Sequence, residues 1–269
     1  MRIAQITDSH ITAPGVLWKD RVDMAAALAC AVERLNEIAP DLVVHTGDIV
    51  DGGGEAQYGL AAEILSDLRA PLRLLPGNHD IRDRMRAVFK GLPEGDFLNF
   101  AETAEGLRLL GLDTIEEGRT AGIMDAPRAA WLAEQLGRGG PALLFAHHPP
   151  CAMGLPFMDI FEFAGADLFA EAVSAAPPLR VATGHVHCAA ERHFAGTLVA
   201  ACPAVGVQIP PTRPEGAPPG FALEPPMIRL HDWSAELGLT VKTVPVDAFP
   251  GPFPFETDPN ADFSATPHD

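Results

Sequence analysis

Short apolar runs, each ending in polar residues, recur along this chain, and this repetition most limits the fold that the sequence can adopt. Strands are predicted at 2–7, 41–46, 72–76, 107–113, 142–147 and 179–183. Apolar residues at helical spacing predict helices over 21–39, 55–69 and 127–136, and later runs predict strands at 197–202, 227–232 and 239–246. The alternation favours an α/β fold with two packed sheets and outer helices over one Rossmann sheet.

The polar residues at the strand ends are of types that bind metals or transfer protons. In chain order, the motifs are DSH (8–10), GD (47–48), GNHD (77–80), HH (147–148) and GHVH (184–187). Active sites of α/β folds lie at the carboxyl ends of strands, so we expect these side chains to converge. Each motif alone is common in ordinary turns, and only their joint occurrence in this order indicates a site.

His185 and His187 flank a single valine after the run 179–183. Alternate residues of an extended segment share a face, so we predict that both imidazoles point into one cavity. An exposed or hydrogen-bonded pair of histidines would give the same sequence, and the other motifs have to decide between these interpretations.

Taken together, the motifs DxH, GDxxD, GNHD, HH and GHxH resemble those of the calcineurin-like metallophosphoesterase superfamily over roughly residues 1–200. The segments DSHI, HHPP and GLPFMD and the Pro-rich stretch 208–226 are most similar to its class III cyclic-nucleotide phosphodiesterase and glycerophosphodiesterase branch. The resemblance implies a two-sheet α/β/β/α metallophosphoesterase sandwich. Protein Ser/Thr phosphatases typically carry GDxxDRG and GNHE, whereas this chain has GDIVDGGG and GNHD, so we do not expect that activity.

The resemblance also implies a site for two divalent metal ions. It places Asp8, His10, Asp48 and His187 on one ion, and Asp48, Asn78, His147 and His185 on the other. Paired catalytic ions lie ~3.5–4 Å apart, and a carboxylate can span that gap, so Asp48 is the expected bridge. Imidazole and oxygen ligands together suit Fe, Mn, Zn or Co better than Mg or Ca.

Three further histidines are expected to act beside the metal ligands. We expect His79 to hydrogen-bond the phosphoryl oxygen and to protonate the leaving alkoxide, with support of its loop as the alternative. His148 is expected to support the ligands or face the substrate, although His147 and His148 could exchange roles. His45 lies within a predicted strand and is expected in the core or behind the ligands.

The expected reaction is hydrolysis of a small phosphodiester by a metal-activated hydroxide. Two divalent cations, two aspartates and one hydroxide leave a single positive charge, which matches one phosphodiester anion. The expected substrates are 3′,5′-cyclic nucleotides such as cyclic AMP, or glycerophosphodiesters. The alternatives are a phosphomonoesterase or phosphonate monoester hydrolase of the same superfamily and, less favoured, a non-catalytic metal-binding scaffold.

Composition and the remaining segments add further expectations. The formal net charge of −17 disfavours a nucleic-acid polymer as partner. Neither a signal peptide nor an apolar run of about 20 residues is evident, so we expect a protein without membrane contact. The four cysteines lack metal-finger spacing and suit reduced thiols, so we expect a cytoplasmic location. The apolar segment 151–163 is expected to wall the substrate pocket or a subunit contact, and the resemblance implies a homo-oligomer. We expect one catalytic domain over 1–248, with 208–226 as a long loop, and an extended or partly disordered tail at 249–269.

Overall fold

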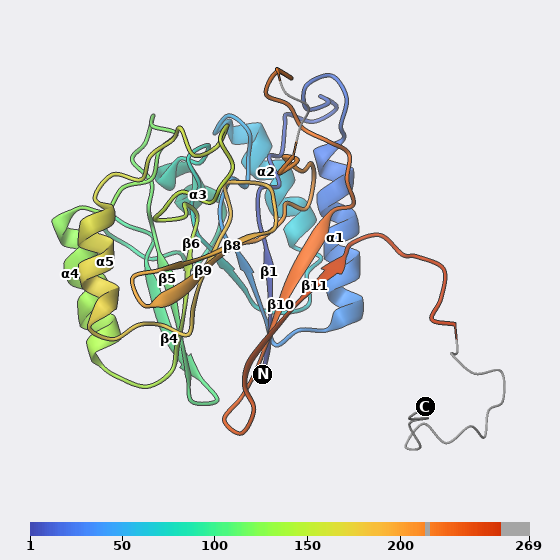
Figure 1. Ribbon diagram of the computed structural model, residues 1–269. Coiled ribbons are helices and arrows are strands. Elements are labelled where there is room, and N and C mark those ends of the chain that lie inside the picture. Colours follow the sequence, from blue (N-terminus) through green and yellow to red (C-terminus); the bar gives the residue numbers. More distant parts are fainter. Residues whose placement is uncertain (213–215, 254–269) are drawn as a thin grey trace, which may run out of the picture.

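Two mixed β-sheets pack face to face in the computed structural model, which describes residues 1–212 and 216–253 (Figure 1). The first sheet has five strands in the order β11–β10–β1–β2–β3. Its first three strands along the chain run parallel, and the last two are antiparallel to their neighbours. The strands are β1 (Arg2–Ile6), β2 (Leu42–His45), β3 (Leu72–Leu74), β10 (Met227–Ser234) and β11 (Gly238–Pro245).

The second sheet has six strands in the order β4–β5–β6–β7–β9–β8. Its four central strands run parallel, and each edge strand is antiparallel to its neighbour. The strands are β4 (Phe100–Ala104), β5 (Leu107–Leu112), β6 (Ala142–Ala146), β7 (Arg180–Thr183), β8 (Ala190–Phe194) and β9 (Thr197–Ala201).

Helices cover the outer face of each sheet (Figure 1). They are α1 (Met24–Ile38), α2 (Glu55–Leu65) and α3 (Arg82–Val88) on the first sheet, and α4 (Ala126–Gly137) and α5 (Ala166–Ser174) on the second. Between the sheets, Ile3, Val44, Leu109, Phe145 and Ala182 form a fully buried apolar layer. This arrangement confirms the predicted α/β/β/α sandwich.

Local signals fix where the longest helices begin and end. Asp23 precedes α1 and accepts a hydrogen bond from the Ala26 amide at 3.0 Å, which satisfies an otherwise free donor of the first turn. At its other end Ala39 adopts a left-handed conformation immediately before Pro40, which cannot continue a helix. Asp125 caps α4 in the same way.

The sequence prediction places most of these elements correctly to within a few residues. It extends α2 to residue 69, whereas the helix ends at Leu65, and it misses α3, β4, α5 and β8. The described part of 208–226 holds no helix or strand beyond a single bridge between Gln208 and Ala222, as expected for a long loop. The predicted tail lies outside the described residues from 254 onward. No described helix combines the length and the apolar character that a membrane span requires.

Backbone hydrogen bonds tie the strand-end loops of both sheets together. The amides of Asp8 and His10 donate to the carbonyls of Gly47 and Asp48 at 3.0 and 2.9 Å. In the second sheet the Gly184 amide donates to the carbonyl of His147 at 2.9 Å. Between the sheets, the amide of Val205, which follows β9, donates to the carbonyl of Thr7, which follows β1, at 3.2 Å. The carboxyl ends of the parallel strands therefore form one connected polar surface at the same end of both sheets.

Candidate active site

Left-handed backbone conformations set the direction of the polar side chains at this surface. Positive φ angles occur at Asp8 (56°), His10 (40°), Asp48 (53°), His185 (68°) and His187 (48°). Such conformations are disfavoured for residues with a Cβ and tend to be retained at functional sites. The premise that His185 and His187 alternate along an extended strand is therefore wrong: β7 ends at Thr183, and each histidine turns separately.

Glycines allow the strand-end loops to approach closely. A Cβ on Gly77 would lie 2.2 Å from both the amide nitrogen and the Oδ1 atom of Asp48. A Cβ on Gly184 would lie 2.0 Å from the Thr7 hydroxyl oxygen and 2.9 Å from Asp8 Oδ2. The glycines of the GN and GH motifs are thus required by packing of one loop on another.

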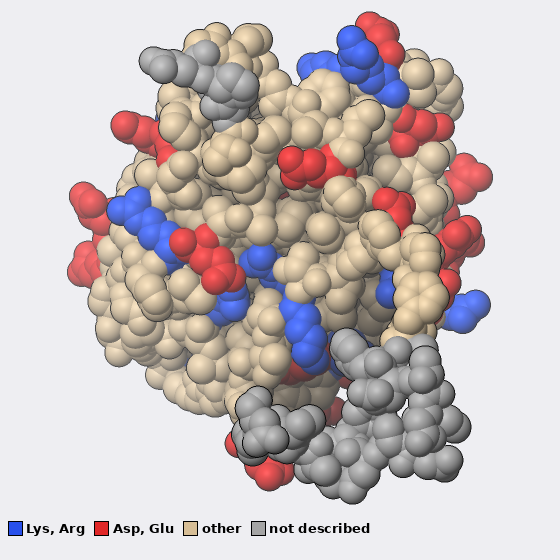
Figure 2. All heavy atoms as spheres, turned by 45° about the vertical axis from the view of Figure 1, so that its right-hand side comes forward, with Lys and Arg blue, Asp and Glu red and all other residues tan. Residues whose placement is uncertain are grey.

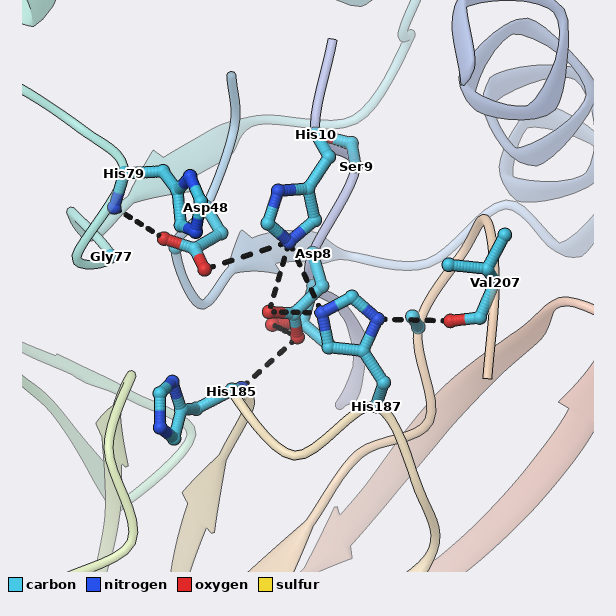
Figure 3. Close-up of polar contacts among 12 residues, drawn as sticks. Asp8, Ser9, His10, Asp48, Gly77, His79, His185, His187 and Val207 are labelled. Carbon is cyan, nitrogen blue, oxygen red and sulfur yellow. Dashed lines mark hydrogen bonds and ion pairs between the residues drawn. The ribbon is translucent and has the colours of Figure 1, made fainter. Parts of the chain in front are cut away.

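Asp8, His10 and His187 form one potential metal-binding cluster (Figure 3). The His187 Nε2 atom lies 3.3 Å from Asp8 Oδ1 and 3.1 Å from His10 Nε2. His187 Nδ1 donates to the carbonyl of Val207 at 2.9 Å, which leaves Nε2 directed at the cluster.

A second potential cluster joins Asp48, Asp8 and His147. His147 Nε2 lies 3.3 Å from Asp48 Oδ2 and 3.2 Å from Asn78 Oδ1. Its Nδ1 atom donates to the carbonyl of Thr46 at 2.8 Å, so the ring is oriented in the same manner as His187. Asp48 Oδ2 also lies 3.6 Å from His10 Nε2, so this carboxylate stands between the two clusters.

His185 joins the second side of the site through the group His147, His148 and His185. Its backbone amide donates to Asp8 Oδ2 at 3.1 Å, while its buried Nε2 atom has no hydrogen-bond partner among the described residues. An unpaired buried nitrogen is costly, and a bound cation would satisfy it.

His148 and His45 differ from His147 and His187 because both of their ring nitrogens are engaged by groups outside the metal-binding clusters. His148 Nε2 donates to the carbonyl of Thr120 at 3.0 Å, and its Nδ1 lies 2.9 Å from the Thr114 hydroxyl. His45 accepts from the amide of Gly47 and pairs with the Ser9 hydroxyl at 2.9 Å. Burial lowers the pKa of His45 to about 4 and holds that of His148 well below its usual range, so both rings are neutral.

His79 stands at the opening of the site with its side chain 39% exposed. Its amide donates to Asp48 Oδ1 at 2.9 Å, and its Nδ1 lies 2.5 Å from the carbonyl oxygen of Asp51. The Asp51 carboxylate lies 3.4 Å from His10 Nδ1 and accepts from Trp18 Nε1 at 2.8 Å. Asp51 thus orients the rings of His10 and His79, a role that the sequence prediction did not assign to it.

Asp80, the last residue of the GNHD motif, holds two of these loops together below the surface. Its carboxylate accepts from the amides of Gly77 and Ile49 at 2.9 and 3.1 Å and from the Tyr58 hydroxyl at 3.1 Å. Burial and the charge of Asp48 raise the pKa of Asp80 to about 6.

The buried carboxylates and imidazoles divide the charge unevenly. Burial would raise the pKa of Asp8 and Asp48, but the adjacent His187 and His147 hold both pKa values below the usual range. Burial works against protonation of His147, yet the charge of Asp48 raises its pKa to about 9. Burial and the neighbouring His147 lower the pKa of His185 to about 3. Two ionised aspartates therefore lie in a buried shell of imidazoles.

The donor set fits divalent metal ions. Asp8 Oδ1 and His185 Nε2 are buried and lack hydrogen-bond partners among the described residues. Asp8 belongs to both clusters, and Asp48 of the second lies 3.6 Å from His10 of the first. Buried polar atoms are normally paired, and mixed imidazole and carboxylate donors suit transition metals or zinc.

A cavity of about 320 Å³ opens above the clusters. Its floor includes His10, Asp48, Asn78, His185 and His187. Its walls include the aromatic residues Trp18, Phe157, Phe161 and Phe221, together with Lys19 and Thr120. Phe157, Met158 and Phe161 belong to the apolar segment 151–163, which lines the cavity as predicted, whereas Trp18, Lys19 and Phe221 were not predicted to lie there.

Comparison with known proteins agrees with this geometry. The model of the calcineurin-like phosphoesterase family matches residues 1–189. The chain belongs to the calcineurin-like phosphoesterase family. The resemblance inferred from the strand-end motifs is thereby confirmed.

Curated relatives of this phosphoesterase span most of its length. It is 32% identical over 264 residues to the probable glycerophosphodiester phosphodiesterase GpdQ of Arcobacter nitrofigilis, covering 95% of this chain and 97% of the relative. It is 27% identical to the 3′,5′-cyclic adenosine monophosphate phosphodiesterase CpdA of Pseudomonas aeruginosa, over 86% of this chain and 85% of the relative. Among solved structures, a dimetal phosphatase from Danio rerio has the same fold, with a TM-score of 0.62 and 15% sequence identity. The match covers 91% of this chain and 99% of that protein.

Proposed function

We propose that this protein is a phosphodiesterase that hydrolyses small phosphodiesters with two divalent metal ions. The observation that carries the proposal is the buried convergence of two ionised aspartates with imidazoles, in which the Nε2 atoms of His147 and His187 each lie 3.3 Å from a carboxylate oxygen. The relatives named as phosphodiesterases, which match over most of both chains, support the diester reaction.

The geometry supports a specific division of ligands. Asp8, His10 and His187 would bind one ion and Asn78, His147 and His185 the other, with Asp48 bridging them because it stands between the clusters. His147 is assigned as the ligand rather than His148, since the Nε2 atom of His147 faces Asp48 and Asn78, whereas both nitrogens of His148 are engaged by Thr114 and Thr120.

Residues around the ions would orient the reacting groups. When bound, the two ions would supply a water nucleophile at neutral pH and stabilise charge on the phosphoryl oxygens. Asp51 fixes His79 through Nδ1, which leaves the Nε2 atom of the exposed ring as the position that can give a proton to the leaving oxygen. His45 and His148 hold the loops that carry Asp8, Asp48 and His147.

The cavity supports a diester rather than a monoester. A diester carries an organic group on each side of phosphorus, and aromatic rings line the cavity beside both metal clusters. We assign the substrates to cyclic nucleotides or glycerophosphodiesters on this basis and on the relatives' names.

A substrate panel on metal-reconstituted protein tests the proposal. Bis(p-nitrophenyl) phosphate should be hydrolysed with a kcat/KM about tenfold or more above that of p-nitrophenyl phosphate, and a chelator should abolish both activities. Faster hydrolysis of the monoester, or of p-nitrophenyl phenylphosphonate, would assign the protein to the corresponding monoesterase. Bound metal without turnover of any ester would make it a binding scaffold.

We also propose a cytoplasmic location, a homo-oligomeric state and a single catalytic domain for this protein. All four cysteines are free thiols in the structure, which supports a cytoplasmic location. On the face shown in Figure 2, Lys and Arg form small groups among Asp and Glu, which supports a small-molecule substrate over a nucleic-acid polymer. We retain 1–248 as the catalytic domain and a homo-oligomeric state as proposals, and light scattering tests the latter.

A further inference from the structure

The rim of the cavity carries two separate pairs of aromatic rings. Trp18 and Phe221 pack edge to face with ring centroids 4.8 Å apart, and Trp18 lies 6.2 Å from the ring of His10. Phe157 and Phe161 form the other pair, and Phe161 lies 6.3 Å from His185. One ring pair therefore stands beside each metal cluster.

A strained turn holds the first ring pair in place. Trp18 and Val22 exchange backbone hydrogen bonds at 2.8 and 3.1 Å across a tight turn. The turn residues Lys19 and Asp20 both have positive φ angles, 50° and 56°, although neither is glycine. Such backbone conformations cost free energy and persist only where surrounding contacts hold them. Here the hydrogen bond from Trp18 Nε1 to Asp51 provides that contact.

Lys19 adds a positive charge at this point of the rim. Its ammonium nitrogen lies 5.3 Å from the centroid of the Trp18 ring, within the range of a cation–π contact. Among the described residues that line the cavity, Lys19 is the only Lys or Arg. A cationic head group placed beside Trp18 would therefore meet the positive charge of Lys19.

Resting on the proposed function, we propose that Trp18, Lys19 and Phe221 form a specificity subsite for a flat, uncharged aromatic group of the diester, such as a nucleobase. The ring pair offers apolar and stacking contacts, and Lys19 can donate to a ring nitrogen or exocyclic oxygen. The same subsite disfavours diesters that carry a quaternary ammonium group, such as glycerophosphocholine, because Lys19 repels their charge. The rim thus selects diesters that carry an aromatic ring and no positive charge on their organic group.

The test compares kcat/KM for three diesters: cyclic AMP, glycerophosphocholine and the ring-free, uncharged glycerophosphoglycerol. Phe221→Leu keeps an apolar side chain and removes the ring, and it leaves the bond between Trp18 and Asp51 intact. It should lower the ratio of cyclic AMP to glycerophosphoglycerol kcat/KM by about tenfold, since stacking contributes about 1–3 kcal/mol per base. Lys19→Glu should raise the ratio of glycerophosphocholine to glycerophosphoglycerol about fivefold. Lys90→Glu, with the same charge change on an exposed residue outside the cavity, should leave both ratios unaltered.

A binding measurement separates this inference from the proposed function. Adenosine has no phosphate, so its titration against tryptophan fluorescence reports the subsite without requiring hydrolysis. Quenching by adenosine that is lost in Trp18→Leu supports the subsite, even if no diester is hydrolysed and the proposed function fails. Diester hydrolysis with unaltered ratios in Phe221→Leu and Lys19→Glu would overturn the subsite while leaving the proposed function intact.

Discussion

The floor and the rim of the cavity are built in opposite ways. The floor consists of buried strand ends, with Asp8 and His147 showing no exposed surface and His185 only 6%. The rim residues lie on partly exposed apolar loops: Ile160, next to Phe161, is 64% exposed, and Val16, two residues before Trp18, is 54% exposed. The floor is polar and held by hydrogen bonds across both sheets, whereas the rim is held by ring contacts, one turn and the hydrogen bond from Trp18 to Asp51.

This difference separates the chemistry of the site from its selection of substrates. Buried ligands with fixed partners preorganise the reacting centre, where small displacements are costly. Loops on the surface of a rigid scaffold tolerate change and can adapt to different organic groups. Changes at the floor should therefore abolish activity on all diesters, and changes at the rim should alter only their ranking.

The largest effect is expected from Asp48→Ala. This variant removes the carboxylate that lies between both clusters, so it should lower kcat/KM for every diester by about 10⁴-fold or more and weaken binding of both ions. Kinetics and elemental analysis provide the measurement. Asp67→Ala, at an exposed position, is the control. Two full equivalents of tightly bound metal in Asp48→Ala would refute the bridging role.

His79→Ala should have the next largest effect, and one that depends on the leaving group. Loss of a general acid costs about 10²–10⁴-fold when the leaving oxygen is a poor alkoxide, and much less for p-nitrophenolate. We therefore expect a greater loss of kcat on cyclic AMP than on bis(p-nitrophenyl) phosphate, with metal content unaltered. Equal losses on both substrates would exclude proton donation by His79.

A smaller effect is expected from Gly184→Ala, which alters packing under the floor. The added Cβ would collide with Thr7 and Asp8, so the free energy of unfolding should fall by about 2 kcal/mol and metal affinity should fall with it. Gly59→Ala is the matched control, because that helical glycine has no neighbouring atom within 4 Å of the added group. It should stabilise the protein by about 0.5–1 kcal/mol in urea denaturation. Equal stability of both variants would contradict the close packing of these loops.

The last prediction concerns stability rather than activity and lies below the floor, between the sheets. His231 is fully buried and donates to Gln5 Oε1 at 3.1 Å. Burial and the charges of Arg229 and Arg180 lower its pKa to about 3, although the charge of Asp232 opposes this shift. The ring is therefore neutral in the folded protein. The unfolded chain takes up a proton on this ring below about pH 6.5, so stability should fall as the pH is lowered from about 6.5 towards 3.

At pH 5 this ring should account for about 2 kcal/mol of the stability lost relative to pH 8. Urea denaturation of the wild type and His231→Gln at both pH values measures that contribution. The glutamine variant should lose about 2 kcal/mol less on acidification and keep its diester activity at pH 8. The same acid sensitivity in both proteins would show that His231 does not titrate on unfolding.

The floor could be predicted from the sequence far better than the rim. The residue types at the strand ends, from Asp8 to His187, and the order of their motifs indicated the family, the sandwich and the converging side chains. The left-handed turns at Asp8 and Asp48 could not be foreseen, because Asp and His adopt this conformation far less often than glycine does. The edge strands β4 and β8 were missed because FAETA and AERHF are short and largely exposed, with little hydrophobic alternation.

The rim was missed for a related reason. Trp18 and Lys19 reach the cavity through a turn without glycine, and Phe221 approaches from a Pro-rich loop about 200 residues later in the chain. Their meeting depends on tertiary structure alone, so no local pattern predicts it. Asp51 was visible only as the last letter of GDxxD, and its contacts with His10, His79 and Trp18 appear only in the fold.

Metal titration of the metal-free protein tests the central claim most directly. Bound metal per chain is measured by elemental analysis alongside kcat for bis(p-nitrophenyl) phosphate as Mn²⁺ or Zn²⁺ is added. Diester hydrolysis should reach its full rate only when two ions are bound per chain, because both clusters of the floor and their shared Asp48 are needed. Full activity with a single bound ion, or with none, would contradict a two-metal site at the strand ends.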